Sequence, residues 1–238
     1  MARSSSSVAA GTLVMVCLVL LPAKVAGDDP WDDCDLGEIH DTWWQDGGLT
    51  WPDTVTQGAF VELFTPSQHP FSYTRVCSKW CSQFADSTLT YTVVIYDDNG
   101  APGPGGEPGP GTLLASVPAV ASDVPNPGGG ICGYYDYEWF GANIAGVPDI
   151  EEGSVFIGVQ LNASVEQGFY LGVDSSDDLP QWVGWNSPDG GATWNFNAYL
   201  QNPDYKALMI RAQALQDDVT IVFIDGFESG DTGSWAIP

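Results

Sequence analysis

Two stretches of the chain alternate their side chains with a period of two, and this pattern constrains the fold more than any other feature. They are residues 89–96 (LTYTVVIY) and 155–162 (VFIGVQLN). Successive side chains of a β-strand point to opposite faces, so this period is typical of pleated strands and not of helices. Both stretches are therefore predicted to be strands with one face in a core.

Turn residues separate further short runs of β-forming sequence. These runs lie at 59–64, 73–84, 112–117, 134–140, 169–173, 181–185, 193–200, 206–212 and 219–224. No amphipathic helical pattern interrupts them, and the Gly/Pro-rich segment 101–111 is typical of a long hairpin connection. About ten strands at this spacing favour an all-β fold, an antiparallel two-sheet sandwich of jelly-roll type.

The charge balance excludes several classes of partner. The 238 residues include 31 Asp and Glu against 6 Lys and Arg, which gives a formal net charge of −25. Phosphate backbones and anionic headgroups would repel such a chain, so neither nucleic acid nor a membrane surface is expected as a partner. Cations and neutral ligands remain.

The N-terminal residues have the features of a secretory signal. Arg3 precedes an apolar stretch from Val8 to Leu21, which is short for a membrane span and is followed by small residues. We therefore expect a secreted, extracellular protein divided into a signal peptide (1–27), an N-terminal extension (28–58), a β-sandwich domain (59–215) and a C-terminal strand with an acidic tail (216–238).

Four cysteines remain once the signal is removed: Cys34, Cys77, Cys81 and Cys132. An even number outside the cell indicates disulfides, and too few histidines and paired cysteines accompany them for a zinc site. In a strand Cys77 and Cys81 would lie about 13 Å apart, too far to bond to each other. Each is therefore predicted to pair with one of the other two, in either order.

One short motif is specific. Ser187, Asp189, Gly191, Thr193 and Trp194 match the pattern S-x-D-x-G-x-T-W, which resembles the Asp box. The resemblance implies a structural turn in a hairpin with the Trp packed beneath it. It implies no sialidase chemistry, because the motif occurs once and an arginine cluster for a carboxylate is missing.

A wider resemblance covers roughly Tyr73 to Ala212. The segments TRVCSKW, VVIYDDNGAPG with TLLAS, SVFIGV, FYLGVD, DGGATW and YKALMIRA are similar to a domain that recurs in secreted bacterial proteins. That domain commonly has a Cys near Leu171 or Gly172, which is absent here, while Cys81 is extra. The resemblance therefore implies no disulfide connectivity and no activity. The end of the chain, Asp225 to Trp235, also resembles a tail of exported bacterial proteins, where a sorting role is conceivable.

Known catalytic motifs are mostly missing. The chain contains no G-x-S-x-G, H-E-x-x-H or phosphate-binding glycine motif. His40 and His69 are interpreted as surface and loop residues. Asp136 and Glu138 are the acids flanked by aromatic residues in a predicted strand, so they are the candidates for paired carboxylates, although exposure on the solvent face explains them as well.

Two binding interpretations remain open. No cofactor is expected, but calcium is the ion that the abundant oxygen ligands favour, with acidic loops at 97–99, 174–178 and 225–231 as candidates. None of these loops has a recognised calcium spacing. Trp182 and Trp185 are candidates for a sugar-stacking platform, although three residues apart in a strand they face opposite sides, which would bury at least one.

The sequence thus favours a secreted, non-catalytic β-sandwich module that binds a glycan or an extracellular protein. An extracellular jelly-roll hydrolase with two carboxylates is the alternative, and a purely structural surface protein is a third. Exposed aromatic rings beside a groove would favour glycan binding, and two buried acids facing a cleft would favour hydrolysis. The presence of neither would favour the structural role.

Overall fold

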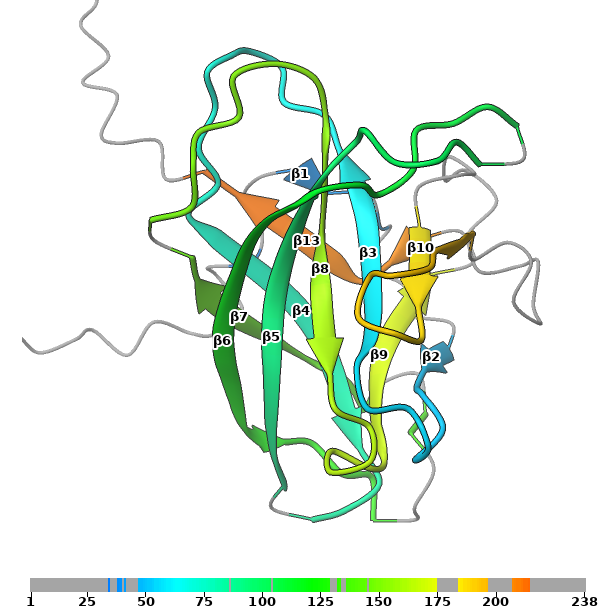
Figure 1. Ribbon diagram of the computed structural model, residues 1–238. Helices are drawn as coiled ribbons and strands as arrows, with labels where there is room; N and C mark the ends of the chain where they lie inside the picture. The colour runs from blue at the N-terminus through cyan, green and yellow to red at the C-terminus, as the bar shows by residue number, and fades with distance from the viewer. Residues whose placement is uncertain are drawn as a thin grey trace, which may run out of the picture.

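The computed structural model describes residues 34, 38–39, 41, 47–85, 87–103, 105–128, 132–133, 136–144, 146–174, 184–196 and 207–214. The expected signal peptide and acidic tail lie outside these residues, as do Trp182, His40 and the predicted strand at 219–224. The described part of the chain is all-β and forms two antiparallel sheets (Figure 1).

One sheet has seven strands. Its main path runs through β1 (Glu38–Ile39), β13 (Ile210–Gln213), β4 (Arg75–Ser82), β9 (Phe169–Asp174) and β12 (Ala207–Leu208). In addition β2 (Gly47–Leu49) pairs with β9, and β7 (Glu138–Asn143) pairs with β4. Strands β1 and β2 come from the predicted N-terminal extension, so that segment contributes to the sheet.

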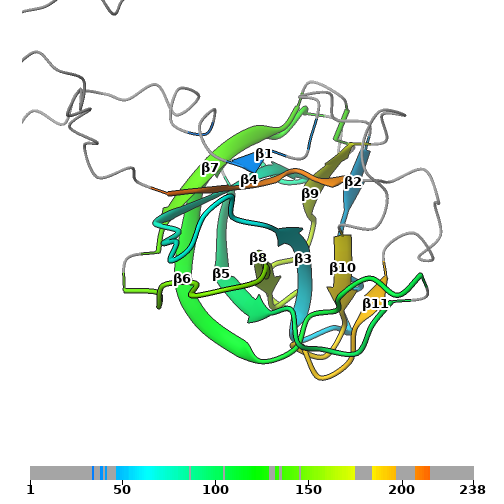
Figure 2. The same cartoon turned by 90° about the horizontal axis from the view of Figure 1, so that it is seen from above.

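The other sheet has six strands and is curved. In order they are β11 (Asn195–Phe196), β10 (Gly184–Ser187), β3 (Gly58–Phe64), β8 (Val155–Leu161), β5 (Ser87–Asp97) and β6 (Leu113–Val124). Viewed from above, β6 sweeps round toward β7, and the seven-stranded sheet lies across the opening of the curve (Figure 2). Strands β5 and β6 are joined by the hairpin connection that the Gly/Pro-rich segment predicts.

The core lies between the two sheets and follows the period of two. In β5 the side chains of Leu89, Tyr91, Val93 and Ile95 are all buried in one cluster with those of the odd-numbered residues of β8. The seven-stranded sheet contributes Trp80, which is fully buried. Because every second residue of both predicted strands reaches this core, the prediction of alternating strands is confirmed.

Two strands differ from the sequence-based boundaries. The predicted strand at 112–117 continues to Val124 as β6, passing through Pro118, which pairs with Thr92. Proline is tolerated there because β6 is the outermost strand and needs hydrogen bonds on one side only. The predicted strand at 206–212 is divided at Met209 into β12 and β13, which pair with β9 and β4 respectively.

Two disulfides join segments that are distant in sequence. Cys34 is bonded to Cys77, and Cys81 is bonded to Cys132. This is the pattern that strand geometry predicts, in which neither strand cysteine pairs with the other. The described residues contain no helix long and apolar enough to cross a membrane. The two disulfides are consistent with an extracellular protein.

Candidate ligand-binding groove

The segment from Ser187 to Trp194 forms a tight, hydrogen-bonded turn between β10 and β11. The Ser187 hydroxyl donates to Asp189 Oδ1 at 2.8 Å and accepts the backbone N–H of Gly191 at 2.7 Å. The Asp189 carboxylate also accepts the backbone N–H of Thr193 at 2.8 Å and its hydroxyl at 2.7 Å. The polar side chains of Ser187, Asp189 and Thr193 therefore all help to close the turn.

This turn is fixed to the sheet beside it. Gly190 donates its N–H to the carbonyl of Gln57 at 2.7 Å, and the ring of Trp194 meets Tyr96 edge-on with 5.0 Å between centroids. Gly190 has a φ of 72° and Gly191 one of 94°, in the left-handed region that glycine adopts without strain. The turn is thus attached to Gln57, the residue that precedes β3.

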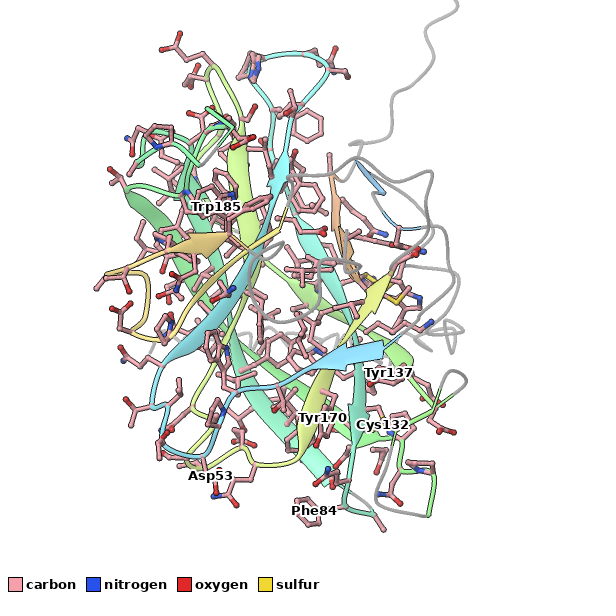
Figure 3. All side chains as sticks on the ribbon, turned by 90° about the vertical axis from the view of Figure 1, so that its right-hand side faces the viewer. Asp53, Phe84, Cys132, Tyr137, Tyr170 and Trp185 are labelled. Carbon is pink, nitrogen blue, oxygen red and sulfur yellow. A yellow bond between two sulfur atoms is a disulfide. The ribbon has the colours of Figure 1, made fainter. Side chains whose placement is uncertain are left out.

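Trp185 does not form an exposed platform. It lies in β10 with 4% of its surface exposed, and its ring packs edge-on against Phe196 and Phe156 at centroid distances of 5.4 and 6.2 Å (Figure 3). The ring belongs to a second apolar cluster on the outer face of the six-stranded sheet. A sugar cannot stack on it there, and Trp182 lies outside the described residues.

The acids that the sequence suggested are not brought together as a catalytic pair. Asp136 precedes β7, where its Oδ2 accepts the backbone N–H of Gly133 at 2.6 Å. Glu138 is exposed in β7, while Tyr137 and Trp139 on either side of it are buried. Asp136 therefore stabilises a turn, whereas Glu138 faces solvent. For Glu138 this agrees with the explanation that it lies on the solvent face of the strand.

The acidic loop at 97–99 closes a hairpin. Asp97 accepts the backbone N–H of Asp98 at 2.9 Å and the side-chain amide of Asn99 at 2.6 Å, while Asn99 Oδ1 accepts the N–H of Thr112. Within the described part of the chain, no three His, Cys, Asp or Glu residues are grouped to hold a metal ion. Most of the loop at 174–178, and all of that at 225–231, lie outside it.

The outer face of the six-stranded sheet changes character along its strands. At one end the outward side chains of β5 and β8 are apolar, as with Tyr96 and Phe156, and the second cluster covers them. At the other end the outward positions are Thr90 and Thr92 in β5 and Gln160 in β8. The apolar end is closed, whereas the polar end is open.

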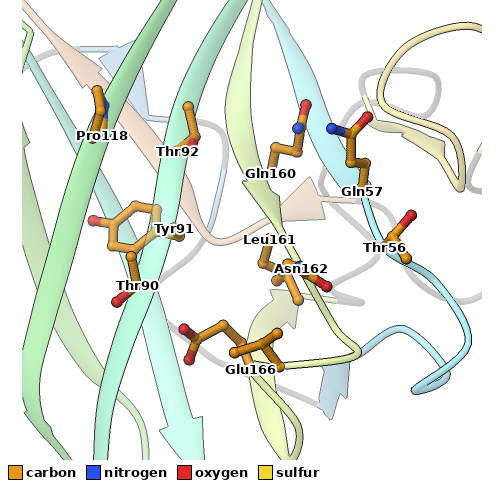
Figure 4. A pocket seen from close by; sticks show the side chains of 11 residues that line it. Thr56, Gln57, Thr90, Tyr91, Thr92, Pro118, Gln160, Leu161, Asn162 and Glu166 are labelled. Atoms are coloured by element: carbon orange, nitrogen blue, oxygen red, sulfur yellow. The ribbon is translucent and has the colours of Figure 1, made fainter.

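An open groove of about 360 Å³ lies at this polar end (Figure 4). Its volume is at the small end of the range of about 300–1,000 Å³ that is usual for small-molecule sites. Its neutral hydrogen-bonding side chains are those of Thr56, Gln57, Thr90, Thr92, Gln160 and Asn162. Pro118 and Val165 add apolar surface, and Gln57 is the residue to which the Ser187–Trp194 turn is fixed.

Among the described residues, Glu166 is the only acid that lines the groove. The turn after β8 places it there, because the backbone N–H groups of Val165 and Glu166 both donate to the carbonyl of Asn162, at 2.9 and 2.7 Å. Burial raises the pKa of Glu166 above its ordinary value of 4.5, and hydrogen bonds from the backbone and side chain of Thr90 oppose that rise. The pairing of β5 with β8 begins at Thr92, so Thr90 lies beyond the end of the paired region. Thr90 is therefore accessible to the Glu166 carboxylate.

The groove was missed from the sequence, although a signal was present. The outward positions of residues 89–96 and 155–162 are polar at one end of each stretch, and the antiparallel pairing of β5 with β8 brings those ends together. Glu166 itself lies in a turn without any motif. No family model, no curated protein and no solved structure matches this chain.

Proposed function

We propose that the protein is a secreted, non-catalytic module of jelly-roll sandwich type that binds a glycan in the polar groove. The described residues that line the groove include no exposed aromatic ring, so the proposal rests instead on its neutral amides and hydroxyls, which offer both donors and acceptors. Sugar hydroxyls need such partners in both roles. Pro118 and Val165 offer apolar surface for the C–H groups of a sugar ring.

The fold and the disulfides support the remaining parts of the proposal. One core shared by two antiparallel sheets is the arrangement expected of a sandwich. The two disulfides favour an oxidising, extracellular location. The hydrogen bonds of Ser187, Asp189 and Thr193 support the Asp box as a structural turn, while a bacterial origin rests on the sequence resemblance alone.

A hydrolase is the second candidate, and Glu166 is the observation that favours it. A carboxyl group with a raised pKa is suited to act as a general acid. Hydrolysis of a glycosidic bond ordinarily needs a second carboxylate within about 5–10 Å. In the part of the chain that the structure describes, Glu166 is the only acid that lines the groove, so binding without hydrolysis is favoured.

A panel of immobilised polysaccharides and oligosaccharides, probed with the mature, disulfide-bonded protein, tests this function. Gln160→Ala should weaken any binding about tenfold, because removal of the amide costs one or two hydrogen bonds. Ser116→Ala is the matched control, since Ser116 is exposed on β6 and does not line the groove.

The outcomes separate the three functions. Binding that Gln160→Ala weakens and Ser116→Ala does not supports the glycan-binding module. Release of reducing sugar that Glu166→Gln abolishes would instead establish the hydrolase. If no member of the panel binds, the glycan-binding module and the hydrolase are both contradicted, and the structural role remains.

A further inference from the structure

We infer that the groove selects glycans that carry a free amine, such as partly or fully deacetylated amino sugars. This inference rests on the proposed glycan-binding function and names the class of sugar. Its basis is the placement of one carboxylate, Glu166, among side chains that are otherwise neutral.

The geometry around Glu166 prepares it for a cation. Thr90 and Glu166 both line the groove, and the backbone and side chain of Thr90 favour the charged form of the Glu166 carboxyl. The described residues that line the groove include no Lys or Arg that could compete as a counter-ion. A protonated amine would form a charge-assisted hydrogen bond, which is stronger than one between neutral groups.

The other lining residues fit the rest of an amino sugar. Gln160 lies opposite Thr92 in the β5–β8 ladder, so an amide and a hydroxyl lie side by side. Both residues line the same groove as Glu166. Tyr91 is the other titratable residue at the groove, but it is buried in the core and its ring packs against Trp80. Recognition of the cation therefore falls to Glu166 alone.

The charge of the whole chain acts in the same direction. A net charge of −25 raises the local concentration of cationic ligands and repels acidic polysaccharides. This long-range attraction does not depend on any one residue, and salt screens it. The contribution of Glu166 to ligand binding must therefore be measured against a control variant that loses one negative charge at another position.

The test compares a chitosan oligosaccharide with its fully N-acetylated counterpart by calorimetry, at physiological ionic strength and just below neutral pH. These probes differ at one position of each sugar, where the first carries a free amine and the second an N-acetyl group. We expect the amine form to bind about tenfold more tightly, and Glu166→Gln to remove that preference. Glu152→Gln is the matched control, because Glu152 is exposed beyond the opposite end of β8.

Glu166→Gln keeps the size and one side-chain oxygen of the original residue, so the variant should fold, and its melting curve checks this. The binding of the amine form should also weaken as pH falls through the raised pKa of Glu166, because protonation removes the negative charge. In the Glu166→Gln variant that pH dependence should be absent.

Each remaining outcome has one meaning. Equal binding of both oligosaccharides, weakened by Gln160→Ala, would overturn the amine preference and leave the glycan-binding function intact. Equal effects of Glu166→Gln and Glu152→Gln would assign the preference to overall charge and also overturn the inference. Equal, Glu166-dependent binding of a short lysine peptide would show a cationic peptide site instead. Failure of every glycan would contradict the proposed function itself.

Discussion

The guanidinium carbon of Arg211 lies 4.1 Å from the centroid of the Trp139 ring, on the outer face of the seven-stranded sheet. Arg211 is fully buried. Its Nε and one terminal nitrogen donate to the two oxygens of Asp41 at 2.9 and 2.7 Å, and the other terminal nitrogen donates to the carbonyl of Cys34 at 2.9 Å. A single cation therefore ties the N-terminal segment to β13 and β7.

Replacement of this cation should be costly. Arg211→Met leaves Asp41 buried without its counter-ion, so we expect the free energy of unfolding to fall by about 3–5 kcal/mol. Equilibrium unfolding in urea measures the change. Addition of Asp41→Leu to Arg211→Met should restore part of the loss, since the buried carboxylate that has lost its ion pair with Arg211 is then removed as well. If the loss of unfolding free energy in the double variant equals the sum of the losses in the two single variants, Arg211 and Asp41 are not coupled.

The two disulfides should each contribute to stability. They close stretches with sequence separations of 43 and 51 residues, so Cys34→Ser with Cys77→Ser, or Cys81→Ser with Cys132→Ser, should cost about 2–5 kcal/mol. Thermal melting of each double variant measures this. Peptide mapping of the native protein is the control, and a Cys77–Cys81 bridge there would contradict the pairing.

The Ser187–Trp194 turn should weaken in acid. Hydrogen bonds from Thr193 and then Ser187 hold the pKa of Asp189 below its ordinary value of 3.8. A lowered pKa in the folded state means that the contribution to stability is present above about pH 4 and is lost as the pH falls through the folded value. Amide hydrogen exchange of Gly191 and Thr193 follows this loss, and Asp189→Asn should make it independent of pH. Equal acid sensitivity in the variant would assign the effect to other groups.

Salt should stabilise the protein without preference for calcium. With a net charge of −25, screening by any salt should raise the melting temperature smoothly. A specific site would add a stabilisation that grows with the logarithm of the calcium concentration. Melting in EDTA, and then in sodium or calcium chloride of equal ionic strength, separates the two. A clearly larger shift in calcium would direct attention to the loop that begins at Asp174.

The period of two predicted the strands well because burial imposes it. Leu89, Val93 and Ile95 are buried in the core, and any other secondary structure would scatter them around its axis. The length of β6 was underpredicted because a proline usually ends a strand, and only its place at the edge of the sheet, which the sequence does not reveal, allows β6 to continue.

The candidate site was predictable only in part. The turn at Ser187 and Asp189 is local, so its sequence pattern specifies its hydrogen bonds. The burial of Trp185 depends instead on Phe156 and Phe196, which come from other strands, and no local pattern reports such neighbours. The groove likewise needs Glu166 to meet Thr90 across a gap of some 75 residues of chain, and tertiary structure alone provides that contact.

Pro118 has a consequence for how copies of this protein coexist at high concentration. It stands near the middle of β6, the long outermost strand of the six-stranded sheet, where a neighbouring molecule would add its own strand. Proline has no N–H to donate, so an intermolecular ladder along β6 is interrupted halfway. Fibril growth through this strand is thereby disfavoured, and many copies can crowd together without merging their sheets.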